Sequence, residues 1–241
     1  MNKKALALST IAVIISFIGG FLLANTLNRR ELETLRAENA QMKNAKPPTA
    51  DQTLADEEIQ KKIAEADQNP TDFEFQKNLA VGLYRYAGMK QEARFLPEVA
   101  RLLKRAHEMN SQDYETIVAL GNVYLDLGQI NKDGAAIEQS REFYRKALAL
   151  KKTDADVQND LGLTYFFAAP PEFEKAIAEY EKALQMNPKH EKALENLVRA
   201  NSSLGKTKEA EDFLNKLKQI NPTSEALPEL EAQIAQSRNK Q

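Results

Sequence analysis

The sequence of 241 residues contains no cysteine and no tryptophan, and it has only two histidines. The absence of cysteine excludes disulfides, thiolate zinc sites and thiol nucleophiles. His107 and His190 lie far apart, and neither has a metal-ligand partner at the usual spacing, so we interpret both as surface residues. Phosphate-binding glycine loops, Gly-x-Ser-x-Gly and His-Glu-x-x-His motifs are also missing. The sequence therefore predicts no catalytic residue, no metal, no cofactor and no enzymatic activity.

Charge of one sign is also lacking. The chain has 33 basic and 35 acidic side chains, which gives a net charge of -2. No stretch forms a basic patch large enough to hold a nucleic-acid backbone. We therefore expect no nucleic-acid partner.

The first thirty residues differ in composition from the rest of the chain. Lys3 and Lys4 precede an uncharged run at 5–27, and Arg29 follows it. A helix of this length covers a bilayer core of roughly 30 Å, whereas the apolar part of a signal peptide is usually about 7 to 15 residues. We interpret residues 1–28 as a membrane anchor rather than a cleaved signal. The expected location is a single-pass protein of a bacterial inner membrane, with the remaining chain outside the cytoplasm.

The following segment has features of a short coiled coil. Leu32, Leu35, Asn39 and Met42 fall on heptad core positions within 29–46. In the run before it, small residues recur every four positions from Ala12, which predicts a homodimer through residues 12–43. Such residues are also common in membrane helices without an interface. Two prolines then open a predicted linker at 47–55.

The remaining chain repeats a pattern. Leu120-Gly121-x-x-Tyr124 recurs as Leu161-Gly162-x-x-Tyr165, with weaker copies at Leu79-Ala80 and Leu197-Val198. Asn187-Pro188 and Asn221-Pro222 come near the ends of the later repeats. A small residue lets two helices approach closely, and proline ends a helix. The pattern resembles the tetratricopeptide repeat (TPR) family, in a membrane-anchored bacterial form.

The resemblance implies an all-α fold, in which about four helical pairs at 56–241 form an α-α solenoid after the N-terminal transmembrane helix. We expect a capping helix at 227–237 and a short helix at 56–66. The first repeats are longer than the family pattern, with the surplus around 89–95 and 129–136. This surplus predicts either longer helices or a protruding loop.

The resemblance also implies a binding face, because the first helix of each pair lines the concave side in TPR proteins. The candidate partner-binding residues are Lys77, Tyr84, Arg85, Asn122, Asp126, Asn159, Phe166, Phe167, Glu195 and Arg199. We expect Phe166 or Phe167 to face solvent, unless the Pro170-Pro171 turn folds back over both. The set with which some TPR domains clamp a C-terminal carboxylate is not matched, because Val81, Ala119 and Asp160 stand in its place.

These features predict a membrane-anchored scaffold or adaptor that binds a protein or peptide partner through its concave face. Two alternatives remain open. One is an assembly-factor subunit that resembles the TPR components of cytochrome c maturation. The other is a structural dimer of the cell envelope.

Overall fold

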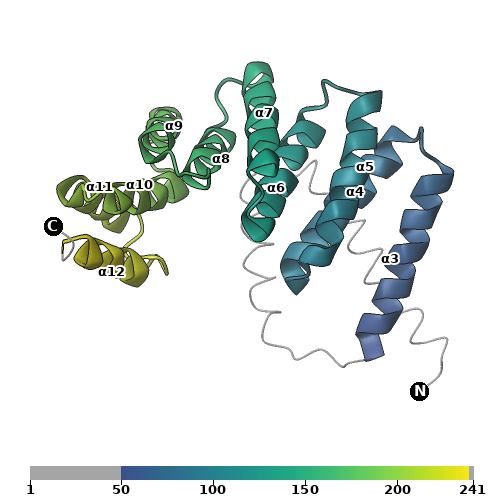
Figure 1. Ribbon diagram of the computed structural model, residues 1–241, viewed down its shortest axis with the longest axis horizontal. Helices are drawn as coiled ribbons and strands as arrows, with labels where there is room; N and C mark the ends of the chain where they lie inside the picture. The colour runs from purple at the N-terminus through teal and green to yellow at the C-terminus, as the bar shows by residue number, and fades with distance from the viewer. Residues whose placement is uncertain (1–49, 239–241) are drawn as a thin grey trace. The chain divides into compact units, whose positions relative to one another are not determined.

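The computed structural model describes residues 50–238, and it describes side chains from Asp56 onward. This part of the chain is all helical (Figure 1). Its α-helices are α3 (Ala50–Gln68), α4 (Phe73–Lys90), α5 (Leu96–Met109), α6 (Tyr114–Asn131), α7 (Gly134–Leu150), α8 (Ala155–Phe166), α9 (Phe173–Met186), α10 (Glu191–Ser203), α11 (Thr207–Ile220) and α12 (Leu227–Arg238). A short 3-10 helix, Ala93–Phe95, precedes α5.

The chain divides between Ala93 and Arg94 into two compact units. The first unit contains α3 and α4, which contact each other. The second unit contains α5 to α12, in which α6 packs on α7, α8 on α9 and α10 on α11. The second unit is therefore a row of helical pairs that ends in the single helix α12.

Aspartates start four of these helices. Asp72, Asp113, Asp133 and Asp154 each accept a hydrogen bond from a backbone N–H in the first turn of the helix that follows. Such a cap satisfies a donor that has no partner inside the helix. The sequence places one capping side chain before each of α4, α6, α7 and α8, which fixes where these helices begin.

Glycine sets the distance between paired helices. A Cβ atom added to Gly121 on α6 would lie 2.5 Å from the ring of Tyr144 on α7. The same addition at Gly162 on α8 would lie 2.4 Å from the ring of Tyr180 on α9. Both rings are buried, so the predicted role of the two glycines as crossing points is confirmed.

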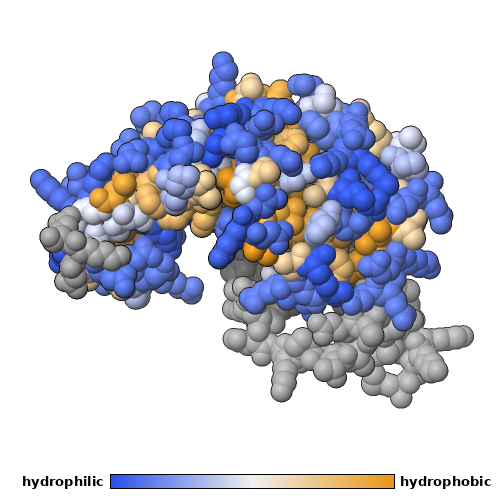
Figure 2. Space-filling view, in the orientation of Figure 1, coloured by the Kyte–Doolittle hydropathy of each residue, from blue (hydrophilic) through white to orange (hydrophobic). Residues whose placement is uncertain are grey.

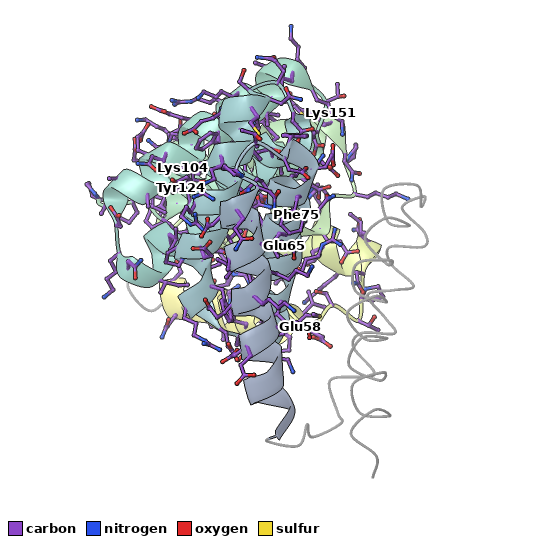
Figure 3. The ribbon with its side chains drawn as sticks, turned by 90° about the vertical axis from the view of Figure 1, so that its right-hand side faces the viewer. Glu58, Glu65, Phe75, Lys104, Tyr124 and Lys151 are labelled. Carbon is purple, nitrogen blue, oxygen red and sulfur yellow. The ribbon has the colours of Figure 1, made fainter. Side chains whose placement is uncertain are left out.

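A cation–π contact also joins α5 to α6. The ammonium group of Lys104 lies 5.3 Å from the ring centroid of Tyr124, and the two labelled side chains are side by side in Figure 3. The Tyr124 ring also stacks on Phe143 of α7, with the two ring centroids 5.8 Å apart. Aromatic rings therefore fill the space between these successive helices.

The surplus residues of the second repeat lengthen its helices. α6 has 18 residues and α7 has 17, whereas α8 has 12 and α9 has 14. Only Lys132 and Asp133 separate α6 from α7. Of the two predicted possibilities, longer helices are confirmed and a protruding loop is excluded for this repeat.

The predicted transmembrane fold class requires correction. Within residues 50–238 no helix is both long enough and apolar enough to span a bilayer. Even α6, which has enough residues, carries Glu115 and Asp126. The fold class is corrected to an all-helical solenoid of TPR-like pairs, and the single-pass membrane location and membrane-anchored type are withdrawn with it. The predicted anchor at 1–28 and coiled coil at 29–46 lie outside the described residues, as does the dimer segment at 12–43.

The termini of the repeat region differ slightly from prediction. α3 begins at Ala50, six residues before the expected short helix, so the end of the predicted linker at 47–55 is helical. No glycine or proline follows Pro48 in this stretch to stop a helix. At the other end α12 begins at Leu227, with Pro228 in its first turn as predicted. The domain boundaries themselves stay predictions.

Candidate functional site

The first helices of the pairs line one side of the second unit. α6 contacts α8, α8 contacts α10, and α10 contacts α12. Among the described helices no contact of similar extent joins α7 to α9 or α9 to α11. The first helices are therefore closer together than the second helices, and we call their common side the inner side of the unit.

The three candidates of the first unit differ in exposure. Lys77 is buried, with its ammonium group 3.7 Å from a Glu74 carboxylate oxygen and 5.0 Å from the ring centroid of Phe73. Tyr84 is half-buried and Arg85 is exposed. Lys77 is thus held by its own helix, and Arg85 is the most accessible of the three.

On α6 the candidates Asn122 and Asp126 are both half-buried. The Tyr144 hydroxyl donates a hydrogen bond of 2.8 Å to Oδ1 of Asn122. The side-chain oxygen of Asn122 is therefore used in a hydrogen bond that holds α7 against α6.

An amide relay joins α10 to α8. Nδ2 of Asn196 donates to Oδ1 of Asn159 at 2.9 Å, and Nδ2 of Asn159 donates to Oδ1 of Asp160 at 3.0 Å. Asn159 is buried, so its orientation is fixed by these two bonds. The relay therefore orients the carboxylate of Asp160.

Burial changes the acidity of two groups beside the relay. It raises the pKa of Asp160 to about 6, although the hydrogen bond from Asn159 acts in the opposite direction. The hydroxyl of Tyr180 is buried without a hydrogen-bond partner among the described residues. Burial, and then the charge of Asp160, raise the pKa of Tyr180. Both groups are therefore held in an environment that disfavours their charged forms.

The remaining candidates of α10 form loose ion pairs. The Arg199 guanidinium lies 3.5 Å from Glu195 on the same helix and 3.5 Å from Glu229 on α12. Charge-assisted hydrogen bonds are usually about 2.7 to 2.9 Å long, so neither pair is tight. Arg199 is shared between two carboxylates on the inner side.

The two adjacent phenylalanines have different surroundings. Phe166 is half-buried and makes edge contacts with Phe173 and Phe167, each with centroids 5.2 Å apart. Phe167 ends α8 and remains 41% exposed. The expectation that at least one of them faces solvent is confirmed for Phe167.

The interpretation of both histidines as surface residues is wrong. His190 is buried and starts α10, because its Nδ1 accepts a hydrogen bond from the N–H of Ala193. Its Nε2 lies 3.1 Å from Oδ1 of Asp156 on α8. His107 is half-buried, and its ring meets the ring of Phe143 edge-on at 5.6 Å. Each histidine is therefore a packing residue between helices.

Sequence reasoning missed four residues of this region, namely Asp160, Tyr180, His190 and Asn196. His190 carried a usable signal, because it stands just before a predicted helix where capping residues occur. The other three become neighbours only when α8, α9 and α10 pack together. Asp160 was considered only as a mismatch to the carboxylate clamp.

Apolar surface is sparse on the face drawn in Figure 2. Hydrophilic side chains cover most of that face, and apolar ones form small separate groups. Phe167, Ile130 and Leu150 are large apolar residues that stay exposed in the second unit. In the part of the chain with described side chains, no group of three or more His, Asp or Glu residues could hold a metal ion.

The fold and the inner side define a helical-repeat protein of the paired-helix solenoid class. Two segments of the chain, 114–154 and 172–234, match family models of the tetratricopeptide repeat. They cover α6 with α7, and α9 to most of α12. These segments are tetratricopeptide repeats, as the sequence pattern predicted.

Solved structures share this fold. A crystal structure of MamA aligns with a TM-score of 0.55 and 20% identity, covering 74% of this chain and 97% of that chain. MamA 41-end from Desulfovibrio magneticus RS-1 aligns with a TM-score of 0.57 and 16% identity, covering 70% and 87%. A thermophilic TPR protein of Thermus thermophilus aligns at 0.55 and 17% identity, covering 74% and 88%. Identities this low show the fold alone. No curated protein sequence matches the chain.

Proposed function

We propose that the chain is a protein-binding scaffold that holds a partner segment on the inner side of its repeats and performs no chemistry of its own. The observation that carries this proposal is the alignment of α6, α8 and α10 on one side of the second unit. Stacked helical pairs create an extended surface on that side, and such surfaces suit extended partners. The repeat domain at 56–241 is the part proposed to bind.

The side chains on the inner side support this function. Asp126 on α6, and Glu195 and Arg199 on α10, are half-buried and polar. Phe167 adds an exposed aromatic ring at the end of α8. Polar groups give orientation to a bound chain, and aromatic rings are frequent binding anchors.

Site-specific crosslinking in the full chain tests this proposal. A photoreactive residue placed at Asp126 or Arg199 reports on the inner side, and one placed at the exposed Glu142 of α7 or Lys182 of α9 reports on the second helices. We expect one protein to be captured from both inner positions and from neither control position. Capture that is equal at all four positions, or absent from the inner ones, contradicts the proposal.

A further inference from the structure

The carboxylate of Asp160 is the most unusual group on the inner side. One of its oxygens accepts the bond from Asn159, and its second oxygen has no hydrogen-bond partner among residues 56–238. The amide relay from Asn196 fixes the direction of this carboxylate. An oriented carboxylate with a free acceptor is suited to a ligand that donates a hydrogen bond.

The hydroxyl of Tyr180 gives a second, independent indication. Its side chain is fully buried, and the hydroxyl has no partner among the described residues. The charges of Asp160 and Arg199 both act on this hydroxyl, so it lies in the same region of the unit. An unpaired buried hydroxyl costs free energy, and a bound partner that pairs with it would recover that cost.

The charge around Asp160 favours a cation. Asp156 on α8 acts electrostatically on Asp160, and Glu195 of α10 and Glu229 of α12 each lie 3.5 Å from the Arg199 guanidinium. Lys192 and His190 also act on Asp160, and Arg199 pairs with Glu195 and Glu229. Four carboxylates, Asp160 included, therefore stand against two permanent cations, Lys192 and Arg199. The local charge is therefore negative, and a positively charged partner is electrostatically complementary to it.

We propose that Asp160 binds a lysine or arginine side chain of an extended basic segment from another protein, which rests on the scaffold function proposed above. The ammonium or guanidinium group donates to the free carboxylate oxygen. Arg199 then pairs with Glu229 alone, and Glu195 becomes a second acceptor for the bound cation. The inner side of α8 and α10 thereby selects the charge of the partner.

Fluorescence anisotropy with the full chain tests this proposal. The probe is a short labelled peptide of alternating glycine and lysine, compared with the same peptide carrying acetyl-lysine. Asp160→Asn keeps an acceptor for Asn159 and removes the charge, and Asp212→Asn removes an exposed charge from α11 as a matched control. We expect Asp160→Asn to weaken binding about tenfold or more, acetylation to do the same, and Asp212→Asn to have no effect.

A pH series gives a readout that a structural role for Asp160 would not change. Binding should weaken as the pH falls through about 6, because Asp160 becomes protonated. Asp156 on α8, Tyr180 on α9, and His190 with Lys192 at the start of α10 also face this group. The part of the pH dependence that comes from Asp160 should be absent in Asp160→Asn.

Three results overturn the proposal. The first is equal binding by the natural chain and Asp160→Asn, and the second is equal binding of the acetylated peptide. The third is peptide binding that appears only after the three arginines of the segment 29–46, namely Arg29, Arg30 and Arg36, are replaced by alanine. That result would make this segment of the chain the occupant. Inner-side crosslinks without any lysine-peptide binding would remove this inference and leave the scaffold function standing.

Discussion

Tyr144 and Tyr180 occupy equivalent places in successive repeats. Each ring packs against the glycine of the preceding first helix, Gly121 or Gly162. The residue after that glycine is Asn122 in one repeat and Leu163 in the next. Asn122 accepts the Tyr144 hydrogen bond, whereas leucine offers Tyr180 no acceptor. The same ring therefore has a hydrogen-bonded hydroxyl in one repeat and an unpaired one in the other.

This difference predicts opposite effects of removing the two hydroxyls. Tyr144→Phe should lower the free energy of unfolding by about 1 kcal/mol, because it breaks a hydrogen bond. Tyr180→Phe should leave it unchanged or raise it, because the buried hydroxyl has no partner to lose. Urea denaturation of both variants measures the difference. A larger loss in Tyr180→Phe than in Tyr144→Phe would contradict this explanation.

The acidity of Asp160 predicts a stability change that depends on pH. Its pKa in the folded chain, about 6, lies above the ordinary value of 3.8, so the folded state favours the protonated form. The loss of folding stability caused by burying the Asp160 carboxylate is absent below about pH 3.8. It grows as the pH rises to about 6 and is constant above that pH. At about pH 7.5, Asp160→Asn should therefore unfold at a higher temperature than the natural chain. The gain in the free energy of unfolding should be up to about 3 kcal/mol.

The control for this prediction is the same pair of proteins at acid pH. At pH 4 the two melting temperatures should nearly coincide, because Asp160 is then protonated. An equal gain at both pH values would show that charge is not the cause. Differential scanning calorimetry across the pH range gives both measurements.

At the scale of the element, the glycines at helix crossings predict a matched pair of substitutions. Gly162→Ala should destabilise the chain by about 1 to 3 kcal/mol, because the new Cβ overlaps the ring of Tyr180 and the backbone of Ala176 is also close. Gly88→Ala lies within α4, where nothing stands within 4 Å of an added Cβ. It should stabilise the helix by up to about 1 kcal/mol, which thermal unfolding can detect. A stabilising Gly162→Ala would refute the packing argument.

The helices of the second unit could largely be predicted from the sequence, because their determinants are local. The Leu-Gly-x-x-Tyr spacing identified α6 and α8, and the two Asn-Pro pairs identified the ends of α9 and α11. The lengths of these helices could not be predicted, since Gly128 lies inside α6 and Gly134 is the first residue of α7, so neither glycine marks the end of α6. Extended helices and a longer loop are both compatible with such a stretch.

The candidate site was less predictable, because it depends on contacts between elements. The resemblance to TPR proteins named candidates on α8 and α10, including Asn159, Glu195 and Arg199, and their role in binding stays a prediction. It could not identify the relay from Asn196 to Asp160, which needs α8 and α10 side by side. Nor could it show that Lys77 is buried against its own helix.

At the scale of the molecule, packing in the second unit is between near neighbours. α12 contacts α10 and α11, and it contributes Leu230 and Ile234 to a cluster with Leu194 and Leu217. Another cluster is centred on α6 to α10. In such a solenoid, stability is approximately the sum of local pair and interface contributions.

Leu230→Asp tests this description. A charge at a fully buried position should destabilise the last helices by several kcal/mol. Amide hydrogen exchange should accelerate in α10, α11 and α12 and remain unchanged in α6 and α7. Gln236→Asp, at an exposed position of α12, serves as the control and should change little. Equal acceleration throughout the second unit would show that it unfolds as one block.

The unequal lengths of neighbouring first helices have a geometric consequence. α6 and α8 begin at the same distance before their Leu-Gly pairs, but α6 has 18 residues and α8 has 12. At 1.5 Å per residue, α6 therefore extends about 9 Å beyond the end of α8. The last turn of α6 carries the exposed Ile130, and the exposed Phe167 directly follows the end of the shorter α8. In a uniform solenoid a bound strand has many equivalent alignments along the repeats. The difference in length between α6 and α8 makes these alignments unequal, which allows one register.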